Sequence, residues 1–154
     1  MEIKERNKKA RFAGILYVLL ILSGLLYLVY IPTVLVDFQS PTKTLENIKA
    51  SEFLFRMGIV TAICSSIIFM LLSIALYNLL QNVAVVPAKF MVLFVWVSIP
   101  ISLVNILNEC KVLTLIDNPV YTTTLGKFDL QMQVMFHLES YYQGIQLSQI
   151  FWGL

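Results

Sequence analysis

The sequence predicts an all-α fold: a polytopic transmembrane helix bundle with four helices in one membrane-embedded domain, residues 1–154. The first observation is composition, because mean hydropathy is +0.80 and only 13% of the residues are charged. A soluble domain carries about a quarter charged residues. The second observation is that residues 12–36 and 57–88, runs of 25 and 32 residues, contain no charge. A spanning helix needs about 20 residues, so lipid is the predicted solvent.

The first helix is expected near residues 10–36, after a basic segment at residues 1–11. Lysine and arginine beside a first span favour the cytoplasmic side, so we predict a cytoplasmic N-terminus and a location in the cell membrane. The uncharged run is longer than the roughly 7–15-residue apolar core of a signal peptide. Pro32 predicts a bend, since proline lacks the N–H of a helical hydrogen bond. The basic residues of the segment are Lys4, Arg6, Lys8, Lys9 and Arg11.

Residues 37–56 carry charges of both signs and are predicted to form an extracytoplasmic connection. The Ser-Pro-Thr sequence at residues 40–42 is a turn signal, and Thr44 is expected to cap a short helix that follows it. Glu52 and Arg56 stand four residues apart, a spacing that is typical of a surface ion pair on a helix.

Two further helices are expected near residues 57–80 and 89–115, joined by a short turn. Pro119 predicts the end of the second one, because a residue before proline avoids helical geometry. The fourth helix is expected near residues 123–154, amphipathic at first and apolar from Tyr141. Only fifteen uncharged residues follow its last acidic residue. They amount to about 22 Å of helix, against a hydrocarbon core of about 30 Å, so we expect this helix to be incomplete.

Four stretches of the chain are similar to one family of membrane proteins. They read KKARFAGILYVLLILSGL at 8–25, NIKASEFLFRMG at 47–58, ALYNLL at 75–80 and SQIFWGL at 148–154. The chain resembles the DUF4386 family, bacterial and archaeal integral membrane proteins with no established function. The resemblance implies a multi-pass membrane protein that is C-terminally truncated relative to the family, whose members carry further spans. It implies no functional residue.

Two stripes of polar residues follow the helical period in the third and fourth predicted helices. Residues three or four apart share one face of a helix, and an unpaired polar group is costly in lipid. We therefore expect both stripes to face the interior of the bundle. The stripes are Ser98, Ser102, Asn105 and Glu109, and Glu139, Gln143, Gln146 and Gln149.

The proposed topology brings polar residues of three helices to one depth, toward the outer side of the membrane. One interpretation is an outward-facing polar pocket that receives a small ligand or a lipid headgroup. The other is hydrogen bonding between helices, worth about 0.6 kcal/mol per bond on average. The candidate pocket residues are Arg56, Asn105, Asn108, Glu109, His137, Glu139, Gln143 and Gln146.

Aromatic residues are expected in two places. Tyrosine and tryptophan favour the membrane–water interface, whereas Phe and Met at helical spacing are typical of a packing or interface-lying stripe rather than a cofactor site. The expected interfacial belt is Tyr27, Tyr30, Tyr141, Tyr142 and Trp152, and the stripe is Phe128, Met132, Met135 and Phe136.

Several classes of site have no signal in this sequence. Cys64 and Cys110 form no CxxC motif, and the single histidine with its scattered acids has no metal-ligand spacing. The six glycines form no phosphate-binding loop. A net charge of +2 without a basic, aromatic-interleaved patch argues against a nucleic-acid partner. We therefore predict no catalytic residue, no metal and no cofactor.

Three functions remain in competition. The first is a non-enzymatic structural or small-ligand- or lipid-binding component, whose partners are membrane lipids, a small ligand or further transmembrane helices. The second is a transporter or channel subunit with a path lined by the glutamine stripe. The third is a membrane enzyme that uses intramembrane carboxylates, with Glu109, Glu139 or His137 as its reactive groups.

Overall fold

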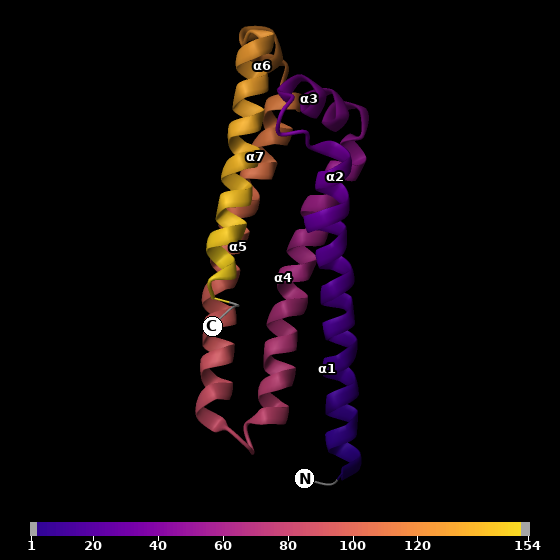
Figure 1. Ribbon diagram of the computed structural model, residues 1–154, viewed down its shortest axis with the longest axis vertical. Helices are drawn as coiled ribbons and strands as arrows, with labels where there is room; N and C mark the ends of the chain where they lie inside the picture. The colour runs from indigo at the N-terminus through magenta and orange to yellow at the C-terminus, as the bar shows by residue number, and fades with distance from the viewer. Residues whose placement is uncertain (1–2, 152–154) are drawn as a thin grey trace.

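The computed structural model describes residues 3–151, and every regular element in that range is helical. The long helices α1 (Ile3–Gly24), α4 (Glu52–Leu80), α5 (Val85–Asp117) and α7 (Lys127–Gln149) run along the long axis of the molecule (Figure 1). The short helix α3 (Pro41–Ala50) lies across one end, which we call the α3 end. The prediction of an all-α fold is confirmed.

Three helices of the described range are long and apolar enough to cross a membrane: Lys4–Leu35, Glu52–Leu80 and Val85–Asp117. These helices correspond to the first three predicted spans, and each begins several residues earlier than predicted. The fourth predicted helix is divided into α6 (Pro119–Thr124) and α7, and its last predicted residues, 152–154, lie outside the described residues. Because α7 contains three charged residues and five glutamines, its role as a fourth span stays a prediction.

The first span changes its helix type before Pro32. After α1 the chain continues as the π-helix η1 (Leu25–Tyr30), in which each hydrogen bond spans one more residue than in an α-helix. It returns to α-helix in α2 (Ile31–Leu35). The wider register is visible where the Ile31 N–H donates to the Leu26 carbonyl. Pro32 explains the change, since its ring clashes with the carbonyl four residues before it. π-Helical turns are rare overall, and those that do occur are often found at functional sites.

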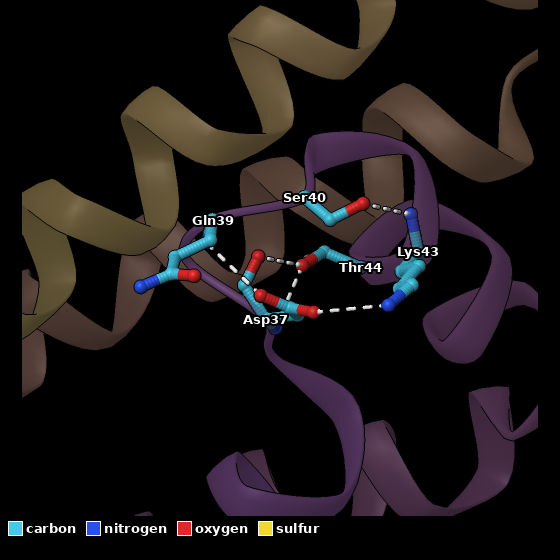
Figure 2. A network of polar contacts seen from close by, with 5 residues as sticks. All are labelled: Asp37, Gln39, Ser40, Lys43 and Thr44. Atoms are coloured by element: carbon cyan, nitrogen blue, oxygen red, sulfur yellow. Dashed lines mark hydrogen bonds and ion pairs between the residues drawn. The ribbon is translucent and has the colours of Figure 1, made fainter.

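A network of polar contacts fixes the corner between α2 and α3 (Figure 2). The hydroxyl of the fully buried Thr44 donates to the Asp37 carbonyl and accepts from the Asp37 N–H, both at 2.9 Å. The Asp37 carboxylate accepts from the Gln39 N–H at 3.0 Å and lies 3.8 Å from Lys43 Nζ. The cap of α3 is Ser40, whose hydroxyl accepts from the Lys43 N–H. The expectation that Thr44 is the cap is therefore wrong, and Thr44 holds the preceding turn instead.

Ion pairs connect the beginning of α4 to the end of α5 at the α3 end. Arg56 Nε donates to Glu52 Oε1 at 2.6 Å, so the predicted pair is present. The same guanidinium donates through Nη2 to Asp117 Oδ2. All three side chains are partly exposed, so these pairs stabilise the fold weakly but determine which helix ends meet.

The helices pack in the order α1–α4–α5–α7, and α3 also contacts α7. The larger hydrophobic core lies toward the α3 end, where Leu35, Ile48, Val112, Val134 and Leu138 are almost fully buried and come from four different elements. The smaller core joins only α1 and α4 toward the opposite end. Packing is therefore densest at the α3 end.

Candidate functional site

A small cavity with both apolar and polar residues in its lining lies between the first span and helices α4, α5 and α7. Its volume is about 30 Å³, which is enough for an ordered water and too little for a metabolite. Pro100 lies inside α5 next to the cavity wall. The polar residues that line the cavity are Tyr27, Ser65, Ser66, Ser98, Ser102, Asn105, Tyr141 and Ser148.

Asn105 forms the main polar contact between α5 and α7. Its side chain is 8% exposed, and Nδ2 donates to the Tyr141 carbonyl at 2.7 Å. Its Oδ1 accepts from Asn108 Nδ2 at 3.3 Å. Gly144 makes this approach possible, because a Cβ atom at that position would overlap the Asn105 amide group. Asn105 is therefore a hydrogen-bonded bridge between two helices, and its polar capacity is used.

On the other side of the cavity, serine and tyrosine residues connect the first span to α4. Ser23 Oγ donates to Ser65 Oγ at 3.1 Å and lies 3.0 Å from the Leu20 carbonyl. The Tyr27 hydroxyl lies near the Ser65 side chain. Tyr27 belongs to η1, so the π-helical turns place this ring at the cavity.

Glu109 lies one helical turn from Asn105, toward the α3 end. Its side chain is partly buried, but Oε2 is completely buried and has no hydrogen-bond partner among the described residues. Tyr27, Tyr141 and Tyr142 are close enough to interact electrostatically with the carboxyl group. A buried carboxyl oxygen without a partner costs free energy, and each such group in a native structure calls for an explanation.

His137 is the second titratable residue in the described range with a buried polar atom that has no hydrogen-bond partner. Its Nδ1 is buried without a partner in the described part of the chain. The ring contacts Phe136 edge-on, with centroids 5.7 Å apart, and Lys111 lies near enough to interact electrostatically. No hydrogen bond or ion pair within residues 3–151 connects His137 to the cavity residues, so we place it beside the site rather than in it.

The remaining candidate residues lie elsewhere. Arg56 is engaged with Asp117, which is two helical turns, about 12 Å, beyond Glu109 along α5. Glu139, Gln143 and Gln146 are exposed, as is Gln149, the last member of their stripe. The structure thus brings together Asn105, Asn108 and Glu109 and separates them from the other candidate residues.

The expectation that the α7 stripe faces the interior is wrong. The opposite face of α7 carries an apolar seam at helical spacing, and this seam packs against α5 and α3. An apolar seam gains more from burial than glutamines without partners would. The buried seam residues include Leu130, Val134, Leu138 and Tyr141. Of the predicted Phe/Met stripe, only Met135 is buried, while Phe128, Met132 and Phe136 are exposed.

Among residues 3–151, no group of three or more His, Cys, Asp or Glu side chains could hold a metal ion. Cys64 is exposed and Cys110 is partly buried, and both thiols are free. The polar groups that do converge are hydroxyls, amides and one carboxyl group, which suit hydrogen bonding rather than metal coordination.

Comparison with known proteins assigns the family. The sequence profile described as "Domain of unknown function (DUF4386)" matches residues 12–154. The chain belongs to this family. No curated protein and no solved structure matches it. Since the family description states no activity, any function of this DUF4386 member has to be argued from its own geometry.

Three site residues of this DUF4386 member were not recognised as such from sequence. Tyr27 and Tyr141 were expected at the membrane interface, yet Tyr141 is only 2% exposed and both line the cavity. Gly144 was not singled out. A glycine inside a helical pattern indicates a close approach of another chain segment, and this signal could have identified it.

Proposed function

We propose that this protein is a non-enzymatic, multi-pass membrane protein that binds a small ligand through the carboxyl group of Glu109. The observation that carries the proposal is the buried Oε2 without a hydrogen-bond partner among the described residues. We further propose that the bundle lies in the cell membrane with its N-terminus in the cytoplasm, which places Glu109 nearer the outer side.

The proposal depends on a difference between the polar residues of the α5 stripe, since some have hydrogen-bond partners and Glu109 Oε2 has none among the described residues. The Ser98 hydroxyl donates to the Val95 carbonyl of its own helix at 2.8 Å, and Asn105 bonds across to α7. The bond of Ser98 stays within α5 and the bond of Asn105 joins two helices, so both groups have partners within the packed bundle. Glu109 shares their face but leaves an acceptor unused, so a packing role does not account for it.

The surroundings of Glu109 limit the chemistry of the ligand. Oε2 has no hydrogen-bond partner among the described residues, so we expect a ligand that binds there to offer a hydrogen-bond donor or a positive charge. Tyr27, Tyr141 and Tyr142 are close enough to interact electrostatically with the carboxyl group, and aromatic side chains tolerate a neighbouring cation well. A small hydrogen-bond donor or a small cation fits this environment better than an anion does.

The competing functions have less support. A transporter path was expected along the glutamine stripe, and Gln143 and Gln146 are exposed on the outer face of α7. A membrane enzyme was expected to bring carboxylates together, and Glu139 is exposed on that same outer face while Glu109 Oε2 is buried. Neither arrangement supplies the convergence that those functions need.

The test is to identify small molecules that copurify with the full chain. Wild-type protein, Glu109→Gln and the exposed control Glu46→Gln are extracted from the native membrane, and bound molecules are identified by mass spectrometry. We expect a donor-bearing or cationic molecule on the wild type and on the control, and its loss from Glu109→Gln. An unoccupied wild type, or equal occupancy of all three proteins, would refute the proposal.

A further inference from the structure

A groove between α1 and α4 lies at the end of the bundle opposite α3. Its volume is about 350 Å³. It is separate from the Glu109 site, because Lys8 and Tyr27 are nineteen positions apart in the first span, about 28 Å along the helix. The residues that line it are Lys8, Lys9 and Phe12 of α1, and Leu71, Ile74, Ala75 and Asn78 of α4.

The lining of the groove is divided into a polar and an apolar part. Lys8 and Lys9 lie just before the first uncharged run, and Asn78 lies near the end of α4. Phe12 and Leu71 follow deeper along the spans and are 56% and 43% exposed. The groove therefore offers cationic donors at headgroup depth and open apolar surface at hydrocarbon depth, which matches the two halves of a lipid.

Charge decides between lipid classes. Residues 1–12 hold five basic side chains and two acidic side chains, Glu2 and Glu5, which leaves a net side-chain charge of +3 in that segment. No acidic residue occurs between positions 57 and 88, so α4 contributes no competing carboxylate to the groove. Basic residues beside a span attract anionic headgroups, whereas a zwitterionic headgroup brings a positive charge of its own.

We infer that this groove binds an anionic phospholipid. The phosphate group is held by Lys8, Lys9 and Asn78, and one acyl chain lies against Phe12, Leu71 and Ile74. The inference is independent of the function proposed for Glu109, since it depends on other residues at the other end of the bundle.

The test compares lipid retention by the full-length protein in detergent, measured by native mass spectrometry. The protein is titrated with phosphatidylglycerol or phosphatidylcholine of identical acyl chains. The test variant is Lys8→Gln with Lys9→Gln. The control, Lys4→Gln with Arg6→Gln, removes the same charge from the same exposed segment but leaves the groove lining intact.

We expect the wild type to retain phosphatidylglycerol at least about tenfold more tightly than phosphatidylcholine, as two lysines near an anionic headgroup would produce. The Lys8/Lys9 variant should lose this preference, and the Lys4/Arg6 control should keep most of it. Inorganic phosphate at matched concentration should not displace the lipid. Equal retention of both lipids, equal losses in both variants, or full displacement by phosphate would each overturn the inference.

Discussion

At the scale of single residues, Asn105 and Glu109 show how two neighbours on one helix face differ in role. They are four residues apart on α5, and periodicity alone predicts that they face the same way. Asn105 has found partners on α7 and on its own helix, while Glu109 Oε2 has none in the described structure. Spacing along the sequence predicts which side chains share a face of α5. Their hydrogen-bond partners depend on how α7 is aligned against α5, and the sequence does not predict that alignment.

Replacement of Gly144 by alanine tests the contact between α5 and α7. The new Cβ would overlap the Asn105 amide group, so the helices must separate or the Asn105–Tyr141 hydrogen bond must break. We expect Gly144→Ala to destabilise the protein by about 1–3 kcal/mol, seen as a lower melting temperature in detergent. Gly14→Ala is the matched control, because nothing lies within 4 Å of a Cβ at that position.

A double variant shows whether the Asn105 side chain is the cause. Asn105→Ala removes the amide group that the Gly144→Ala methyl would meet, so the loss in the double variant should be smaller than the sum of the two single losses. Additive losses, or a Gly144→Ala protein as stable as Gly14→Ala, would contradict the contact.

Glu109 is expected to cost stability in the absence of ligand. A buried carboxyl oxygen without a partner is unfavourable, and replacing it with an apolar side chain of similar size removes that cost. We expect Glu109→Leu to raise the melting temperature of ligand-free protein in detergent, by the equivalent of about 1 kcal/mol. Glu46→Leu on the exposed face of α3 is the control and should change little. A lower melting temperature for Glu109→Leu would mean that the carboxyl group has a stabilising partner.

At the scale of elements, α7 and the first span show where sequence patterns stop being informative. In α7 an apolar seam and a polar stripe both follow the helical period, so the sequence predicts two faces but not which one is buried. The assumption of lipid on all sides led to the wrong choice, and packing on α5 and α3 buries the seam. In the first span, Pro32 predicted a break, and the form of that break, a π-helical segment that presents Tyr27, depends on local geometry.

The corner between α2 and α3 depends on one hydroxyl. Thr44→Val keeps the shape of the side chain but removes both hydrogen bonds to the backbone of Asp37, in a position that is fully buried. We expect a loss of about 1–3 kcal/mol, measured as a reduced melting temperature. Thr42→Val, at an exposed position of the same helix, should have little effect. If both variants melt alike, the network in Figure 2 contributes nothing to stability.

At the scale of the whole molecule, the uncharged runs predicted the three spans, because apolar segments of that length are more stable in lipid than in water. The order α1–α4–α5–α7 and the arrangement of the site could not be predicted, since they depend on contacts between residues far apart in sequence. Because of these contacts, the two ends of the bundle differ in how many elements pack together. Five elements share the core toward α3, while the lipid groove opens between α1 and α4 at the other end.

The orientation of these two ends in the membrane is the last prediction. The basic residues before the first span predict that the groove end lies in the cytoplasm, and the first span then leads α3 to the outer side. In a background with Cys64→Ser and Cys110→Ser, a cysteine introduced at Glu46 should react with a membrane-impermeant thiol reagent added to intact cells. A cysteine introduced at Lys4 should react only after permeabilisation. Both positions are exposed, so accessibility within the protein does not limit labelling. The reverse pattern would invert the topology and place Glu109 nearer the cytoplasm, where a different pool of ligands would reach it.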